Sequence, residues 1–280
     1  MGRRLQVSIW NCPVCGGDAE RCARSLVCGK GHTFDYARSG YVNLLPVNRK
    51  RTKDPGDNAL MVQARRSFLS KDYYKPLSDQ LCEVMNRLCP AEGVLLDAGC
   101  GEGYYTKNVA EALAASGKPA AVYGVDLAKC AVDAAAKSCK SAEFAVGSIF
   151  HLPVSGESCD ALMSLFAPYC GGEFQRVLKP KVKMVLVIPG TMHLMGLKEA
   201  IYDTPYANEV QNYELEGFVF LGAERVDGEI VLKDPEDIRN LFSMTPYYYK
   251  TGREEHRRLE ELTELRTQIS FEVLQYEKEV

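Results

Sequence analysis

The chain has 280 residues, a mass of 31.1 kDa, 34 basic and 37 acidic residues, and 11 cysteines. Its hydrophobic fraction of 46% and charged fraction of 25% are ordinary for a globular protein, which excludes a fibrous or wholly disordered chain. No run approaches the ~18 apolar residues of a membrane span, and no apolar secretory core follows the basic start. We expect a cytoplasmic protein with one large domain, or a domain plus a small module, whose cysteines are thiols, metal ligands or catalytic groups.

Charge is distributed unevenly along the chain. Residues 1–54 contain ten basic and four acidic residues, a net charge of +6, whereas the remaining 226 residues contain 24 basic and 33 acidic ones, a net charge of −9. This asymmetry suggests a polyanionic partner for the basic segment. A solvated surface is the commoner explanation of charge runs, so the pattern alone does not decide.

The first elements in chain order are a small cysteine-rich segment and a linker. Residues 8–41 hold four cysteines, five glycines and a histidine without apolar periodicity, so this segment needs a staple to fold. Residues 46–58 are rich in proline, glycine and charge and indicate a linker.

Two helices are predicted next. The first has Asp57 as N-cap and one apolar face, and the second runs from about Pro76 to Leu88. The face of the first comprises Leu60, Met61, Ala64 and Phe68.

The cysteine-rich segment has the spacing of a zinc site. Cys12 and Cys15 are two residues apart, and Cys28 and His32 follow in the pattern C-x2-C-x12-C-x3-H. Four sulfur and nitrogen ligands in closed tetrahedral geometry favour Zn²⁺ in a structural role. Cys22 is a spare thiol that could compete as a ligand. The alternatives are coincidence or a redox cysteine pair, which lacks its usual strand–helix context here.

From residue 93 onward, predicted strands and helices alternate. Strands are expected at about 94–96, 121–125, 143–146, 161–165 and 183–188, with helices to Ala115 and over 128–140 between them. Further strands are expected at about 217–226 and 266–276, with a helix from Asp234-Pro235 through Phe242. This order predicts an α/β fold with a doubly wound, mostly parallel sheet, as in Rossmann-like proteins.

The turn after the first of these strands predicts a cofactor site. Asp97 precedes three glycines, Gly99, Gly101 and Gly103, and the next strand ends in Asp126. Glycines allow a ligand to approach the backbone closely, whereas a dinucleotide fingerprint would have its third glycine one residue later. Asp126 suits ribose hydroxyls and Asp97 suits an ammonium, so the expected ligand is S-adenosylmethionine. A plain structural turn is the alternative for the glycines alone.

Two further loops at the same edge are candidates for substrate contacts. Gly147-Ser148-Ile149 follows the third strand and is expected to border adenine. Leu165-Phe166-Ala167-Pro168-Tyr169 follows the fourth strand and resembles the end of the (Asn/Asp)-Pro-Pro-Tyr motif of amino-group methyltransferases. It lacks the polar residue that binds an exocyclic amine, which allows a ring nitrogen as acceptor. Phe166 and Tyr169 are equally well explained as core aromatics or as base-stacking residues.

Over nearly its full length the chain resembles the RlmA-type 23S rRNA (guanine-N1)-methyltransferases. The shared blocks, besides the zinc and glycine motifs, are 40–46 (GYVNLLP), 54–57 (DPGD), 63–69 (QARRSFL), 193–195 (HLM) and 244–246 (MTP). The turn at Lys179-Pro180-Lys181-Val182 departs from the usual Lys-Pro-Gly-Gly.

The resemblance implies a class I methyltransferase with an N-terminal zinc module, usually a homodimer, that methylates N1 of a guanine in hairpin 35 of 23S rRNA. It implies further cofactor contacts at Tyr74, Thr106, Lys107 and His193. It suggests a zinc-ribbon RNA-recognition module at 1–45, a linker with helices at 46–92 and a methyltransferase domain at 93–280.

The catalytic base and the RNA contacts are less defined. Asp160, His151 and His193 are conceivable bases for the guanine N1 proton, and no pattern selects one. The leading phosphate contacts are Arg49, Lys50, Arg51, Arg65 and Arg66. Two alternatives remain open. A small-molecule methyltransferase would give the basic N-terminal segment no function. A non-catalytic zinc-ribbon RNA-binding protein would give the cofactor motif no function.

Overall fold

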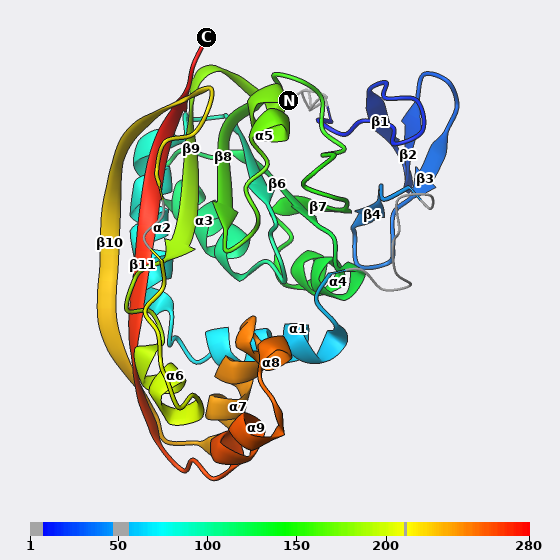
Figure 1. The fold of residues 1–280 in the computed structure, drawn as a ribbon. Coiled ribbons are helices and arrows are strands. Elements are labelled where there is room, and N and C mark those ends of the chain that lie inside the picture. The colour runs from blue at the N-terminus through cyan, green and yellow to red at the C-terminus, as the bar shows by residue number, and fades with distance from the viewer. Residues whose placement is uncertain (1–7, 47–55, 210–211) are drawn as a thin grey trace.

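The computed structural model describes residues 8–46, 56–209 and 212–280, with the side chains of residues 249 and 250 excepted. Within this part the chain forms an eight-stranded sheet in the order β10-β11-β9-β8-β5-β6-β7-β4 (Figure 1). Strands β4 to β9 run parallel, whereas β11 is antiparallel to both of its neighbours, β9 and β10. The strands are β4 (Val42–Asn43), β5 (Val94–Ala98), β6 (Ala121–Asp126), β7 (Ala142–Val146), β8 (Cys159–Leu165), β9 (Leu178–Pro189), β10 (Phe218–Leu232) and β11 (Leu265–Lys278). The predicted doubly wound α/β sheet is confirmed.

Helices cover one face of this sheet and the N-terminal head covers the other. Helices α2 (Lys75–Leu88), α3 (Tyr104–Ala115) and α4 (Lys129–Ser138) pack on the first face. The second face is covered by the head and by the short helix α5 (Gly171–Val177). The head is a small antiparallel sheet of β1 (Ala19–Cys22), β2 (Ser25–Cys28) and β3 (Thr33–Asp35).

The head and the large sheet share one hydrophobic core. Trp10 is fully buried, and its ring meets that of Tyr123 on β6 edge-on at a centroid distance of 5.3 Å. Leu26 and Cys28 of the head belong to the same cluster. Strand β4 then joins the edge of the large sheet beside β7. A segment too small to bury a core of its own therefore obtains one from the large sheet.

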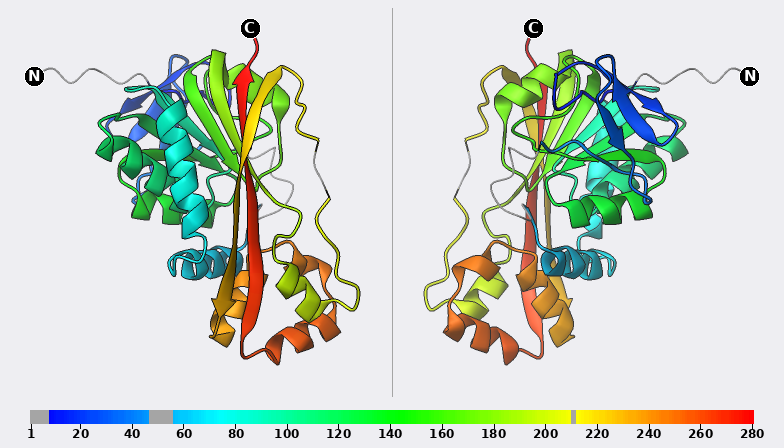
Figure 2. Two further views of the ribbon diagram at one scale, coloured as in Figure 1. Left: turned by 90° about the vertical axis from the view of Figure 1, so that its left-hand side faces the viewer. Right: turned by 90° about the vertical axis from the view of Figure 1, so that its right-hand side faces the viewer.

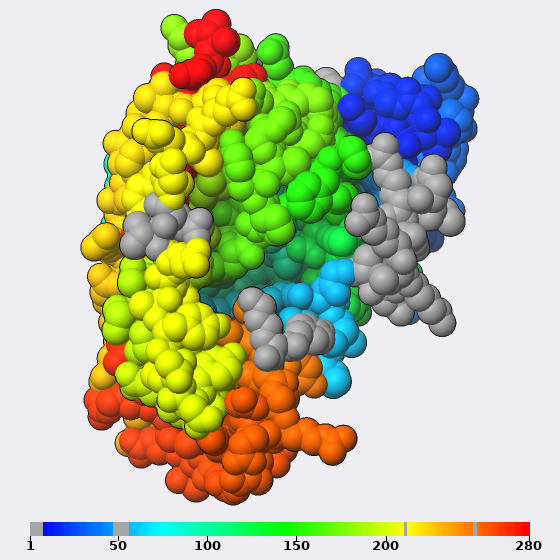
Figure 3. All heavy atoms as spheres, in the orientation of Figure 1, coloured from blue at the N-terminus to red at the C-terminus, as the bar shows by residue number. Residues whose placement is uncertain are grey.

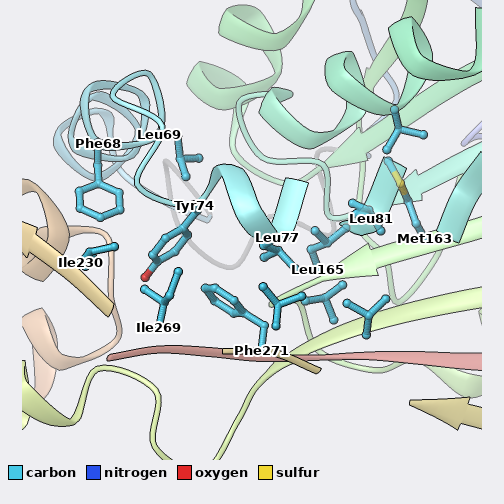
Figure 4. Packing of buried hydrophobic residues seen from close by; sticks show 14 of the residues in the cluster. Phe68, Leu69, Tyr74, Leu77, Leu81, Met163, Leu165, Ile230, Ile269 and Phe271 are labelled. Atoms are coloured by element: carbon cyan, nitrogen blue, oxygen red, sulfur yellow. The ribbon is translucent and has the colours of Figure 1, made fainter. Parts of the chain in front are cut away.

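The C-terminal hairpin of β10 and β11 is longer than the rest of the sheet and carries a helical cluster at its far end. Figure 2 shows the two strands continuing past the sheet to α6 (Met195–Ile201), α7 (Pro235–Ser243) and α9 (Arg253–Glu260). Helix α8 (Tyr247–Lys250) and helix α1 (Ala59–Leu69) lie beside α7. Figure 4 shows Phe68, Tyr74 and Phe271 in the core between these helices and β11.

Some predicted elements need correction. The N-cap of α1 is Asn58, whose side chain accepts a hydrogen bond from the Met61 amide, and not Asp57. Leu60 was predicted on the buried face of α1 but is 75% exposed. The buried residues of this helix are Met61, Val62, Ala64, Phe68 and Leu69. Helix α4 ends at Ser138 rather than Lys140, and helices α5, α6, α8 and α9 were not predicted. The helix predicted from about Pro76 to Leu88 is confirmed and begins one residue earlier, at Lys75, and the Asp234 cap is confirmed.

Two other sequence predictions concern the linker and the absence of a membrane span. Most of the predicted linker, including Arg49, Lys50 and Arg51, lies outside the described residues. Among the described residues, every helix is too short or too polar to cross a bilayer.

Candidate functional site: a zinc knuckle pair and a cofactor edge

The four predicted metal ligands meet in the head. The ligand atoms of Cys12, Cys15, Cys28 and His32 all lie within 4.8 Å of one another. The Nδ1 atom of His32 is 3.3 Å from Cys28 Sγ and 3.5 Å from Cys12 Sγ. Tight turns form both halves, since the Gly16 amide donates to the Cys12 carbonyl and the Gly31 amide to the Cys28 carbonyl, each at 2.8 Å. Three sulfurs and one nitrogen at these spacings fit a closed tetrahedral Zn²⁺ site, which leaves no position for a reacting water.

The glycine loop between β5 and α3 has the backbone that its sequence requires. Gly99, Gly101 and Gly103 have φ values of +89°, +54° and +85°. A Cβ atom on Gly99 would lie 2.7 Å from Ala167 Cβ, and one on Gly103 would lie 2.8 Å from Ala135 Cβ. The loop therefore needs glycine for both its conformation and its close packing.

Asp126 organises this loop through its backbone contacts. Its carboxylate accepts hydrogen bonds from the Gly101 amide at 3.0 Å and the Ala128 amide at 2.8 Å, which ties the ends of β5 and β6 together. The Gly147 amide donates to the Asp126 carbonyl at 3.0 Å, so the predicted adenine loop starts beside it. Burial raises the pKa of the Asp126 carboxyl group.

Asp97 is the buried acid at the end of β5. The Thr106 hydroxyl donates to Asp97 Oδ2 at 2.5 Å, whereas Oδ1 is buried and has no hydrogen-bond partner among the described residues. Burial, with a contribution from the Asp126 charge, raises the pKa of Asp97 to about 7. A buried carboxylate oxygen without a partner fits a ligand that carries a donor, such as the ammonium of S-adenosylmethionine.

Tyr74 and His193 form a second buried group beyond the glycine loop. The Tyr74 hydroxyl is 3.4 Å from His193 Nε2, and both rings pack against Phe271. Lys107 points along α3 instead, with its amine 3.9 Å from Glu111. The structure thus brings Asp97, Thr106 and Asp126 together with the three glycines at the carboxyl ends of β5 and β6, a region called the cofactor edge below. Their role in cofactor binding, and that of Tyr74, Lys107 and His193, remains a prediction.

The loop after β8 contributes two aromatic rings with different surroundings. Phe166 has a left-handed φ of +55°, is 46% exposed, and lies 6.5 Å from Tyr105 and 5.7 Å from Phe271 between ring centroids. Tyr169 packs edge-on against Phe174 of α5. Phe166 therefore lies beside the first turn of α3, whereas Tyr169 lies against α5. Figure 3 shows the surface hollowed between the green strands of the sheet and the cyan α1 helix.

Comparison with known proteins agrees with this arrangement. The family model described as RlmA, N-terminal matches residues 10–53, and a methyltransferase domain model matches residues 95–181. A Streptomyces fradiae protein named 23S rRNA (guanine(748)-N(1))-methyltransferase is 33% identical over 202 residues, covering 71% of this chain and 70% of the relative. A Micromonospora griseorubida protein, provisionally named a 23S rRNA (guanine-N1)-methyltransferase, is 32% identical over 90% of this chain and 81% of its own length.

The chain belongs to the 23S rRNA (guanine-N1)-methyltransferase family. YxjB of Bacillus subtilis (strain 168), provisionally named with the same activity, is 28% identical over 98% of this chain and 99% of its own length. The resemblance seen in the sequence is confirmed, as is the combination of a zinc ribbon with a methyltransferase domain.

Against this family background, the three conceivable bases differ sharply in position. Asp160 lies at the start of β8, where it accepts from Lys179 Nζ at 2.6 Å and from the Val94 amide at 2.9 Å, so it is at the edge opposite the glycine loop. Burial lowers the pKa of His193 to about 3, and its Nδ1 accepts from the Ser270 amide. His193 is therefore neutral and both ring nitrogens face partners. His151 is exposed and lines a cavity of about 340 Å³ beside Cys12 and Leu44.

The two arginines of α1 have different surroundings. Arg65 forms an ion pair with Asp57 and donates to the Met244 carbonyl at 3.5 Å, and its Nη1 atom is 3.8 Å from where a Cβ atom of Gly101 would lie. Arg66 is exposed next to Glu102; burial raises the pKa of the Glu102 carboxyl group, and the charge of Arg66 opposes that increase. Arg65 therefore lies over the cofactor loop with 26% of its side chain exposed, whereas Arg66 is exposed; that either residue contacts RNA stays a prediction.

Tyr105 is a residue of the site that sequence reasoning did not select. Its hydroxyl is buried without a hydrogen-bond partner in the described structure, and its ring lies between Tyr104 and Phe166. The only signal in the sequence was its place in the first turn after the glycines, where an aromatic residue is as easily explained by core packing.

Proposed function

We propose that this chain transfers the methyl group of S-adenosylmethionine to N1 of a guanine in 23S rRNA. The observation that carries the proposal is the unpaired, buried Asp97 oxygen beside the three left-handed glycines, in a chain of this family. S-adenosylmethionine supplies an activated methyl group on its sulfonium. The side chains proposed to bind it are Tyr74, Asp97, Thr106, Lys107, Asp126 and His193, with Gly99, Gly101 and Gly103 allowing its close approach.

The task of the protein is then to orient the acceptor and to accept a proton. Guanine N1 lies on the base-pairing edge, so the base must be unpaired and turned out to reach the methyl donor. The exposed ring of Phe166 offers a surface on which such a base stacks. The Nδ1 atom of His193 already accepts a hydrogen bond from the Ser270 amide and its Nε2 atom faces the Tyr74 hydroxyl, so His193 is not the group proposed to take the proton.

We propose that the head and its basic linker hold the RNA backbone. Phosphate contacts fix the register of the RNA without reading its sequence. Arg66 is the exposed described cation on α1 for this role, with Arg49, Lys50 and Arg51 preceding it in the chain. The finer proposals are a target in hairpin 35, a homodimer, action in the cytoplasm, and division into a zinc-ribbon module at 1–45, a linker region at 46–92 and a catalytic domain at 93–280.

Methyl transfer to protein-free 23S RNA, followed by mapping of the modified nucleotide, tests the proposal. The wild-type protein should methylate a single guanine at N1. Asp97→Asn should abolish transfer, whereas Asp160→Asn, at the opposite edge of the sheet, should retain it in the folded protein. Methylation of a small molecule but not of RNA would contradict the proposal.

A salt titration of RNA binding tests the electrostatic part separately. If basic side chains hold phosphates, the affinity must fall steeply as salt rises, and Arg66→Gln should reduce the slope by about one. An affinity that does not respond to salt would remove this part of the proposal. RNA binding without any binding of S-adenosylmethionine in calorimetry would instead favour the non-catalytic alternative.

A further inference from the structure

The hydroxyl group of Tyr105 is buried without a partner. Tyr105 lies in the first turn of α3, between Gly103 and Thr106. Its hydroxyl oxygen has no hydrogen-bond partner among the described residues. Native proteins pair nearly all buried polar groups, since an unpaired one has lost its hydrogen bonds to water without replacement. A partner from outside the chain would explain why this position carries tyrosine rather than phenylalanine.

The surroundings of Tyr105 place this missing partner at the cofactor edge. The ring centroid of Tyr105 is 5.0 Å from that of Tyr104 and 6.5 Å from that of Phe166, on the loop after β8. Burial raises the pKa of the Tyr105 phenol well above its usual value. The group therefore keeps its proton and is available as a hydrogen-bond donor.

Asp97 Oδ1 is the second unpaired buried atom at this edge and has the opposite character. It is an acceptor, on the strand that leads into the glycine loop, while Tyr105 is two residues beyond that loop. The two unpaired groups thus lie on either side of one short loop. A ligand with a hydrogen-bond donor at one end and an acceptor at the other would satisfy both groups.

Arg65 adds a positive charge on the same side as the donor. Its Nη1 atom lies over Gly101, and its charge acts on the Tyr105 phenol. A guanidinium has five N–H donors, and the bonds of Arg65 to Asp57 and the Met244 carbonyl leave others for a ligand. A cation and a hydroxyl donor together are the usual partners of a carboxylate.

We propose that the Tyr105 hydroxyl and the Arg65 guanidinium bind the α-carboxylate of S-adenosylmethionine, while Asp97 accepts from its ammonium. The amino-acid end of this cofactor is a zwitterion, so it matches an acceptor and a donor pair separated by one loop. The inference rests on the proposed function, and it adds two residues that contact the cofactor, of which Arg65 comes from α1. The cofactor site then extends from the catalytic sheet to the helix that follows the linker.

Calorimetric titration of Tyr105→Phe with two ligands tests the inference. The ligands are S-adenosylmethionine and its decarboxylated form, which keeps the sulfonium and the amine but lacks the carboxylate. Loss of one hydrogen bond to a charged group should raise the Kd for S-adenosylmethionine about tenfold. The Kd for the decarboxylated form should be the same in the variant and in the wild type.

The melting temperature of the ligand-free protein provides a second readout. Tyr105→Phe removes an unpaired buried hydroxyl, so the melting temperature should stay the same or rise. Tyr73→Phe is the matched control, because the Tyr73 hydroxyl donates to Asp237 at 2.7 Å. That control should lower the melting temperature and leave both Kd values unchanged.

Three results would overturn the inference. One is an unchanged Kd of Tyr105→Phe for S-adenosylmethionine, and another is an equal increase for both ligands, which would mean that the hydroxyl does not reach the carboxylate. The third is a wild-type protein that binds neither ligand, which would refute the proposed function itself and is distinguished by the wild-type titration alone.

Discussion

Replacement of Asp97 by asparagine should change the way in which stability depends on pH. Asp97 is 1% exposed, and burial raises its pKa to about 7. In the unfolded chain the carboxyl group titrates near its ordinary value of 3.8. The folded, ligand-free protein therefore binds this proton more tightly than the unfolded chain does, and ionisation of Asp97 destabilises the fold.

The size and the pH range of this effect follow from the two pKa values. Below pH 3.8 both states are protonated and the group has no effect. Between that value and pH 7 the stability falls as the pH rises, and above pH 7 the loss is complete. A separation of about three pH units at ~1.36 kcal/mol each gives a total of about 4 kcal/mol. The asparagine variant does not titrate, so this destabilisation is absent from it, although its unpaired amide costs a constant ~1–3 kcal/mol.

Urea denaturation of the ligand-free wild type and of Asp97→Asn between about pH 5 and pH 8 measures the effect. The difference in the free energy of unfolding should shift in favour of the variant by about 2 kcal/mol between pH 5 and pH 7 and then level off. Taking the difference removes the contribution of His193, which is common to both proteins. That contribution has the opposite sign, because the lowered pKa of His193, about 3, makes stability rise with pH up to the ordinary value of 6.5. A difference that does not vary with pH would refute the reasoning.

Three further substitutions test the loop, the helical cluster and the metal centre. Gly103→Ala should lose about 1–3 kcal/mol of stability and bind S-adenosylmethionine more weakly, because its Cβ atom would meet Ala135 at 2.8 Å; Gly117→Ala, equally left-handed but with no atom within 4 Å, should retain cofactor binding in the same titration. Lys198→Met should destabilise the protein by about 2 kcal/mol in urea, because the fully buried amine donates to the Tyr206 carbonyl at 2.9 Å and to Asn208 Oδ1 at 2.7 Å; an unchanged unfolding midpoint would contradict the importance of these bonds. Cys28→Ser should lose its zinc by elemental analysis and melt at a lower temperature, whereas Cys22→Ser, at an exposed thiol outside the cluster, should keep one zinc per chain.

The parts of the site that depend on short spacings were predictable from the sequence. The zinc ligands are set by two tight turns, and the glycines around Asp97 by backbone conformations that other residues rarely adopt. The alternation of strands and helices likewise predicted the sheet, because the spacing of apolar residues along each segment indicates whether it is a strand or a helix. Errors at this level were local, as with the N-cap of α1, where Asn58 and Asp57 are adjacent residues of similar capping ability.

The contacts between distant segments were decided only by the tertiary structure. Sequence composition indicated that Arg65 carries a charge, and the fold placed that charge over Gly101 and against Asp57 rather than on the outer surface. Asp160 was a conceivable base until the direction of β8 put it at the wrong edge of the sheet. The sequence alone therefore determined the chemistry that this protein carries, a zinc-stapled head and a glycine loop between two acids. Packing decided which polar groups are buried without a hydrogen-bond partner, because burial depends on residues brought together from distant parts of the chain. The sequence alone could not show that Asp97 and Tyr105 have such groups.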